Sequence, residues 1–353
     1  MLPNYSILHK QDIFITEKYE PDIRRDELSF LSRSFERHFN ERPYLHHTCY
    51  LFLTKTTKER SRQQSNWNTL CRGFLVPKEI RDKETVERFM EAVGQFESIV
   101  NDSGLVRLER LTTEEITGTE NEPGIIERYL TLSADGTTML QDMQLNPDGM
   151  RIGDKRLCLH TLSDLDDLPG KVKTDGRYER LSTDRSDCRL SYAAPVGVML
   201  PCDHIYNQWI FIDDSNENLS RFEKAAKNMQ SLSRYSRSNQ INKEWLDEYL
   251  NEAHSNGLQS VRCHCNIIAW AENGHELRRV KNDVGSALAL MECTPHHNTT
   301  DLPALYWAGI PGNEADFPAE ETFYTFTGQA LCFFTAETCY RTVSYTHLRA
   351  HET

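Results

Sequence analysis

Apolar and polar residues follow two different periods along the first part of this chain. Residues 5–15, 48–53 and 105–111 are rich in β-branched and aromatic residues and predict strands. Two stretches between them repeat apolar residues every three or four positions, which predicts amphipathic helices. The first follows Asp26 as its N-cap and carries Leu28, Leu31, Phe35 and Phe39. The second spans 82–101 and carries Val86, Phe89, Met90, Val93, Phe96, Ile99 and Val100.

The second part of the chain repeats the alternation. We predict strands at 204–212, 261–270 and 304–308, and helices at 219–232, 242–257, 277–291 and from Phe323 onward. Gly257 is expected to end its helix. Between the two parts, residues 112–187 are rich in Gly, Pro, Asp and Ser, which indicates turns and short strands.

These elements predict an α+β protein with mixed sheets and packed amphipathic helices in two lobes. The strand, helix, strand, helix, strand order of the first lobe favours an open α/β layer. We place the N-terminal lobe at 1–145, an irregular linker or insertion at 146–187, and the second lobe at 188–342. Helices 82–101 and 219–232 are expected to bury their apolar faces in the core, and an interface with another protein is the alternative.

Composition and charge argue against nucleic-acid binding and against a membrane-spanning or secreted chain. The 353 residues carry a formal charge of −13, which would repel a phosphate backbone. Two small basic groups, Arg33, Arg37 and Arg42 in one place and Arg234 and Arg237 beside Tyr235 in another, are interpreted as solvated or helix-end cations rather than a DNA site. With no signal sequence and no apolar run of 18 residues, we expect a cytoplasmic chain whose ten cysteines are reduced thiols.

Nucleotide chemistry finds no support in the sequence. The only Gly-Lys pair, Gly170 and Lys171, is followed by Val172, and Leu165 stands where a phosphate-binding loop needs its first glycine. Asp213 and Asp214 follow an apolar stretch, as in a strand that delivers a carboxylate to magnesium. The same order is typical of a helix N-cap, which we prefer.

Metal ligands are the next possibility. Cys-x-Cys on a strand places both thiols on one face, and Cys-x-x-His is a spacing that zinc accepts. The residues concerned are Cys263, His264, Cys265, Cys293, His296 and His297. We favour buried thiols over a zinc site. The acidic turn of Asp164, Asp166 and Asp167 lacks the Gly and Glu of a calcium loop, so we interpret it as solvated. We therefore predict no catalytic, cofactor-binding or metal residue.

Long stretches of the chain resemble a known family. They are DELSFLSRSFERHFNERPYLHHTCYLFLTKTT (26–57), RIGDKRLCLHTLSDLDDLPGKV (151–172), LSTDRSDCRLSYAAPVGV (181–198), AKNMQSLSRYSRSNQ (226–240) and YWAGIPGNEADF (306–317). They are similar to TraG-family conjugation ATPases of Bacteroides-type conjugative transposons, which are motor ATPases of type IV secretion systems. The resemblance covers about residues 3–342. The tail VSYTHLRAHET (343–353) instead resembles a translated sequencing adapter.

The resemblance implies a non-catalytic N-terminal region whose parent continues into an ATPase domain that uses ATP and magnesium. It implies docking to channel subunits at the cytoplasmic face of the inner membrane, with a possible homo-oligomer and no catalytic residue on this chain. We expect both ends of the natural protein to extend further, and we expect poor solubility and self-association. A stand-alone adaptor without hydrolytic activity and a small zinc-dependent binding module are the alternatives.

Overall fold

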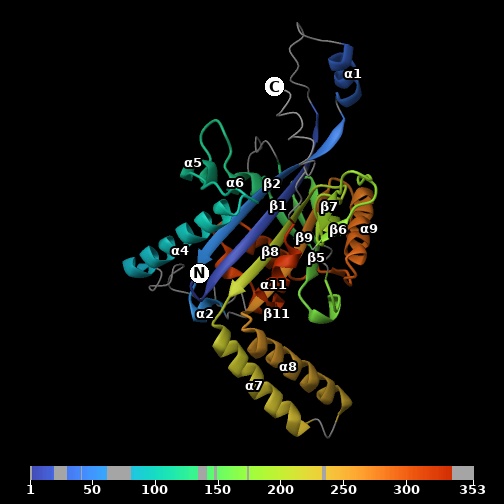
Figure 1. Ribbon diagram of the computed structural model, residues 1–353. Coiled ribbons are helices and arrows are strands. Elements are labelled where there is room, and N and C mark those ends of the chain that lie inside the picture. The colour runs from blue at the N-terminus through green and yellow to red at the C-terminus, as the bar shows by residue number, and fades with distance from the viewer. Residues whose placement is uncertain are drawn as a thin grey trace.

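One large antiparallel sheet organises the protein (Figure 1). The computed structural model describes residues 2–19, 30–40, 42–61, 81–133, 141–146, 149–172, 175–232 and 236–335. The nine strands of the sheet follow the order β2-β1-β8-β9-β5-β4-β3, with β11 beside β9 and β10 beside β5. They are β1 Ser6–Lys18, β2 Pro43–Lys55, β3 Met143–Asn146, β4 Gly149–Ile152, β5 Lys155–Leu162, β8 His204–Ile212, β9 Ser260–Ala271, β10 His296–His297 and β11 Phe323–Phe326.

The centre of the sheet is buried on both faces. Every residue of strands β8 and β9 except the last of each is buried, as expected of strands that are covered on both faces. Helix α9 (Gly274–Leu290) covers one face with Val280, Val284 and Leu288. Helices α6 (Ile125–Thr131) and α10 (Leu302–Ala308) cover the other.

Two extensions leave this body (Figure 1). Helices α7 (Ser215–Leu232) and α8 (Arg237–Asn256) form a hairpin whose base packs on Phe326 of β11. Gly257 ends α8 in the left-handed conformation with φ of 61°, as predicted. At the opposite end, β1 and β2 run out of the body together and carry helix α1 (Phe30–Phe39).

The remaining elements are short, apart from α4. They are α2 Lys58–Ser61, α4 Lys83–Asp102, α5 Thr113–Thr117, α11 Thr327–Ala330 and a two-stranded sheet of β6 Asp175–Arg177 and β7 Arg189–Ser191. No helix within the described ranges has the length and apolar character needed to cross a membrane.

The predicted α+β class is confirmed, but the local layer type is wrong. Every pair of neighbouring strands in the sheet is antiparallel, so the first part of the chain is not an open α/β layer. Strands from all three predicted parts, 1–145, 146–187 and 188–342, belong to this one sheet. Tail residues 343–353 lie outside the described residues.

Three predicted elements are wrong. Residues 304–308 lie in helix α10, because Pro303 in the first turn of the helix needs no hydrogen-bond partner for its nitrogen. The chain from Phe323 pairs with β9 as strand β11, which is followed by α11 and a 3-10 turn. The strand predicted at 105–111 does not form, since those residues belong to no helix and pair with no strand.

Candidate docking surface

The end of the β1–β2 arm carries a small aromatic cluster. Pairing of β1 with β2 extends to Tyr19, whose backbone N–H donates to the carbonyl of Arg42 at 3.0 Å. The Tyr19 ring lies 6.2 Å from Phe35 and 6.0 Å from Phe39 of α1, in edge-on contacts. Tyr44 of β2 completes the cluster, 6.4 Å from Tyr19. These contacts hold α1 on the arm through a few aromatic rings.

Most of the apolar surface of α1 faces solvent. Phe30 is 82% exposed and Leu31 is 77% exposed, while Phe35 in the cluster is still 47% exposed. Large patches of exposed apolar side chains mark interaction sites on soluble proteins. We define the docking surface by these residues of the arm: Phe30, Leu31, Phe35, Phe39 and Tyr44.

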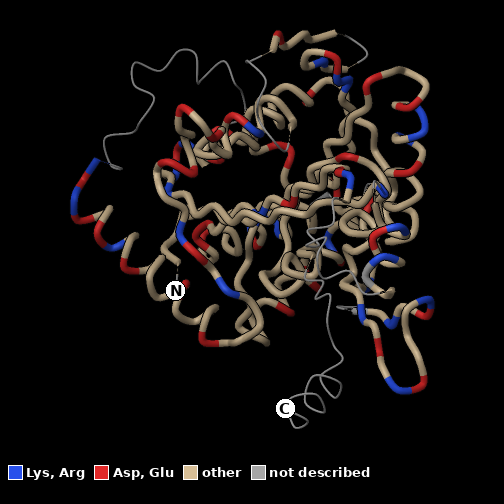
Figure 2. Tube along the Cα trace, turned by 90° about the horizontal axis from the view of Figure 1, so that it is seen from above, with Lys and Arg blue, Asp and Glu red and all other residues tan. Residues whose placement is uncertain are grey.

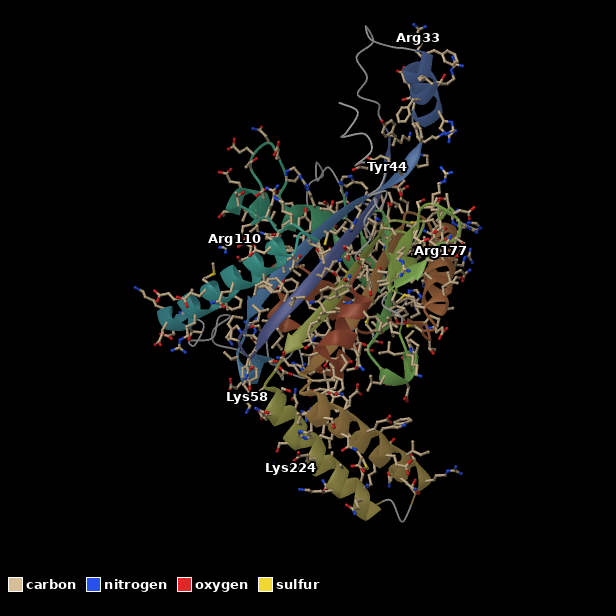
Figure 3. The ribbon with its side chains drawn as sticks, in the orientation of Figure 1. Arg33, Tyr44, Lys58, Arg110, Arg177 and Lys224 are labelled. Carbon is tan, nitrogen blue, oxygen red and sulfur yellow. The ribbon has the colours of Figure 1, made fainter. Side chains whose placement is uncertain are left out.

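The first predicted basic group lies on and beside this surface. Arg33 and Arg37 are exposed residues of α1, and Figure 3 shows Arg33 at the outer end of the arm. Arg42 contacts the Nε2 atom of His38 at 3.1 Å. The structure therefore brings this group together next to apolar side chains.

The second predicted basic group is only partly described. Arg237 is the first residue of α8 and is exposed, while Arg234 and Tyr235 lie outside the described residues. Along the described trace, Lys and Arg alternate with Asp and Glu (Figure 2). This mixture gives no dense positive stripe of the kind that binds nucleic acid.

The six residues considered as zinc ligands are divided between the two faces of the sheet and its edge. Cys263 and Cys265 do share one face of β9, buried in the core with Cys293, as the spacing predicted. His264 points to the other face and uses both ring nitrogens, one at 2.5 Å from the Glu321 carbonyl and one at 3.1 Å from the Asn266 amide. Burial lowers the pKa of His264 to about 3, so its imidazole is neutral.

The last two of these candidates, His296 and His297, have other partners. His296 lies 2.8 Å from the carboxylate of Asp167, and the His297 ring contacts His160 at 5.4 Å. Burial raises the pKa of the Cys265 thiol well above its usual range, which favours the protonated form over the thiolate that zinc needs. Nowhere in the described part of the chain do three or more His, Cys, Asp or Glu residues come together to hold a metal ion.

The two neighbouring aspartates after β8 have separate structural roles. Asp214 accepts hydrogen bonds from the backbone N–H groups of Asn216 and Glu217 at 3.0 and 3.3 Å, so it caps α7 as predicted. Asp213 is buried and accepts from the Nε of Arg262 at 2.6 Å. Arg262 also donates to the hydroxyl of Ser61 at 2.7 Å, which ties α2 to the sheet.

The other acidic and glycine motifs are also structural. Asp164 accepts from the backbone N–H of Asp166 at 3.2 Å and so begins a short turn of helix. Gly170 and Lys171 lie between β5 and β6 in a stretch without regular structure.

A row of buried amides crosses the middle of the sheet, and sequence reasoning missed it. Gln11, Asn207 and Asn266 stand opposite one another on β1, β8 and β9. Gln11 donates to the Oδ1 of Asn207 at 3.0 Å, and Asn207 donates to the Oδ1 of Asn266 at 3.0 Å. Since these groups satisfy one another, we interpret the row as a device that fixes strand register.

A second unpredicted cluster surrounds Asp12 on the opposite face of β1. Its carboxylate accepts from His47 at 2.9 Å, Gln208 at 3.0 Å and Thr335 at 2.8 Å, and it pairs with Lys10. Burial alone would raise the pKa of Asp12, but the bonds from His47 and Lys10 hold that pKa well below its usual range. The cluster stabilises the root of the arm and anchors residue 335 to it.

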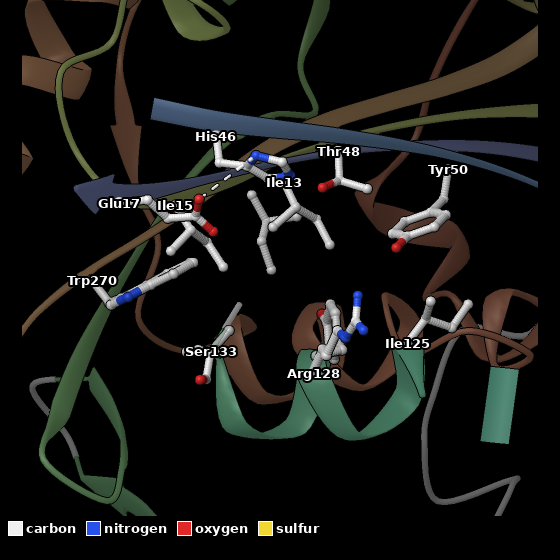
Figure 4. Close-up of a pocket in the computed structure, with 13 residues that line it drawn as sticks. Ile13, Ile15, Glu17, His46, Thr48, Tyr50, Ile125, Arg128, Ser133 and Trp270 are labelled. Atoms are coloured by element: carbon white, nitrogen blue, oxygen red, sulfur yellow. Dashed lines mark ion pairs between the residues drawn. The ribbon is translucent and has the colours of Figure 1, made fainter. Parts of the chain in front are cut away.

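A small cavity lies between the β1–β2 arm and α6 (Figure 4). It has a volume of about 70 Å³, with a floor that includes Ile13, Ile15 and Trp270. Arg128 and Tyr50 stand at its rim, and His46 lies 3.8 Å from the carboxylate of Glu17. The cavity therefore lies on the face of β1 and β2 that is turned toward α6.

No protein-family model matches this sequence, and no curated protein matches it.

Proposed function

We propose that this chain is the non-catalytic docking part of a conjugative-transfer (type IV secretion) motor ATPase. The observation that carries the proposal is the apolar surface of α1, where Phe30 and Leu31 are 82% and 77% exposed at the end of an arm. The resemblance of the sequence to TraG-type motor ATPases names the kind of assembly. ATP and magnesium belong to the parent protein in this account.

The arm suits a docking role because its base is rigid and its tip is apolar. Asp12 at the root is fully buried and makes bonds to both neighbouring strands and to residue 335. At the tip, Phe35 and Phe39 of α1 contact the ring of Tyr19. Burial of one such side chain by a partner stabilises a complex by about 1.5–3 kcal/mol.

The partner in this proposal is a subunit of the transfer channel. That partner would present an apolar groove, since an amphipathic helix docks its apolar face into such a groove. The exposed side chain of Arg37 beside the apolar side chains favours acidic residues at the rim of that groove. Docking of this kind would hold the motor at the cytoplasmic face of the inner membrane as a peripheral protein.

The proposal can be tested by competition during DNA transfer. Excess chain, produced in a donor cell that carries a Bacteroides-type conjugative transposon, should occupy the docking site of the native motor and lower the transfer frequency. The variant Phe30→Ser/Leu31→Ser should restore transfer, because it removes apolar contact without touching the body. A matched variant with Ile241→Ser and Trp245→Ser, which are also exposed but lie on α8, should still inhibit. Equal inhibition by all three chains would exclude α1 as the docking element.

A stand-alone adaptor of a secretion or DNA-transfer system is the second candidate. It shares the exposed α1 surface and differs in having no ATPase parent. An adaptor would also inhibit transfer when overproduced, so the competition result must be combined with the sequence of the coding DNA, considered below.

A further inference from the structure

Strand β2 forms one edge of the large sheet. Its 13 residues pair with β1 one to one, without a bulge, and no other strand of the described ranges pairs with its far side. No residue of β2 is buried, and the half from Pro43 to Cys49 is the more exposed. A long edge without a bulge is unusual, because its free backbone groups invite pairing with another chain.

The hydrogen bonds that flank the strand identify the free groups. Tyr19 donates to the carbonyl of Arg42, and Thr56 donates to the carbonyl of Tyr5, so even-numbered positions of β2 bond to β1. In an antiparallel ladder the alternate residues direct their N–H and C=O groups outward. The outward groups of the exposed half therefore belong to Leu45, His47 and Cys49.

The usual protections of a sheet edge are missing from this strand. Between its ends, Pro43 and Lys55, it contains no proline and no Asp, Glu, Lys or Arg. Natural edges are commonly protected by such residues, by bulges or by short strands. The opposite edge of the sheet follows that rule, because β3 is only four residues long.

The difference in length between the two edges indicates which strand of a second copy would pair with β2. Pairing of β2 with β3 of another copy would be limited to four residues and would not close. Pairing of β2 with β2 about a two-fold axis uses the longer edge on both sides and closes as a dimer. Because the interior of β2 carries no full charge, such pairing opposes no like charges. We propose that the exposed half of β2 pairs antiparallel with β2 of a second copy of this chain.

The test removes the backbone N–H of Leu45, which points away from β1. Leu45→Pro removes that donor and leaves the bonds to β1 in place, while the matched variant Leu45→Ala keeps it. By sedimentation equilibrium, wild type and Leu45→Ala should form dimers with similar dissociation constants, and Leu45→Pro should dimerise about tenfold more weakly. A wild-type chain that stays monomeric, or equal dimerisation of the proline variant, would overturn the proposal.

A second measurement covers the case in which the proline variant does not fold. Hydrogen exchange followed by NMR on the wild-type chain should show the amides of Leu45, His47 and Cys49 protected in the dimer and exposed on dilution. The amides of Thr48 and Tyr50, which bond to β1, should not change. Protection of the odd positions only after a foreign channel subunit is added would assign the edge to that partner instead. The dimer proposal does not rest on the conjugation function, so either can fail alone.

Discussion

Asp213 and Asp214 are adjacent in sequence, yet they stabilise the protein in different ways. Asp213→Asn should lower the free energy of unfolding by about 3 kcal/mol, because it leaves the buried guanidinium of Arg262 without its counter-charge. Asp214→Ala removes only the cap of α7 and should lower the free energy of unfolding by about 1 kcal/mol. Urea denaturation of both variants checks the order. A larger loss for Asp214→Ala would contradict it.

His160 should make the protein sensitive to moderate acid. Burial lowers its pKa to about 4, with further lowering by His297 and Lys281. The unfolded imidazole titrates near 6.5, so the stability from the neutral form is present above about pH 6.5 and is lost as the pH falls toward 4. Wild type should lose at most about 3 kcal/mol from this residue over that range.

The variant His160→Phe isolates that contribution. It keeps a ring in the buried site and cannot take up a proton, so its unfolding free energy should fall less between pH 6.5 and 4 than that of wild type. Denaturation curves at several pH values provide the measurement. Parallel pH profiles for the two proteins would show that His160 does not titrate as described.

The Asp12 cluster consists of contacts that cannot be predicted from local sequence patterns. Thr335 is 323 positions from Asp12, and Gln208 is 196 positions away. No local spacing links them, because it is the order of strands in the sheet that brings them together. The same holds for the amide row of Gln11, Asn207 and Asn266.

At the scale of elements, α1 should contribute little to stability. Phe30→Ser/Leu31→Ser should change the free energy of unfolding by no more than about 0.5 kcal/mol, because both side chains are already in water. Val280→Ser on α9, whose side chain is 4% exposed, should cost several-fold more. Thermal and urea unfolding of the two proteins make the comparison. Unfolding of the α1 variant would mean that the helix belongs to the core.

Hydrophobic periodicity predicted the long elements well. The strand expected at 204–212 is β8, and the helix expected at 219–232 is α7, with Leu219 and Ala226 buried as the pattern indicated. Burial itself is less predictable. Helix α4 also has an apolar stripe, yet within it only Ala92 is buried and Met90 is 49% exposed. Phe96 packs against the core, so the expectation of core packing holds for only part of this helix.

The docking surface illustrates the same limit. The spacing of Leu31, Phe35 and Phe39 predicted an amphipathic helix, and α1 is that helix. Periodicity reports that a face is apolar, and it does not report whether the chain itself covers that face. Only the placement of α1 at the end of the arm shows that Leu31 is exposed.

At the scale of the whole molecule, one sheet joins strands from all parts of the chain. The cores on its two faces share β1, β8 and β9, so the arm and the body are held by one continuous structure. The α1 surface and the β2 edge both lie on the β1–β2 arm. In the proposed assembly, a dimer formed through β2 would present two α1 helices to the channel, which increases the effective affinity of docking.

The central claim is that this chain is part of a motor ATPase, and the coding DNA beyond codon 341 tests it most directly. We predict that, in the genome of the source, the reading frame continues from Arg341 into an ATPase domain with a Gly-x-x-x-x-Gly-Lys-Ser/Thr loop. Residues 343–353 would then be absent from the natural protein. A genomic frame that encodes those eleven residues and stops after Thr353 would contradict the claim and leave the stand-alone adaptor as the function to test.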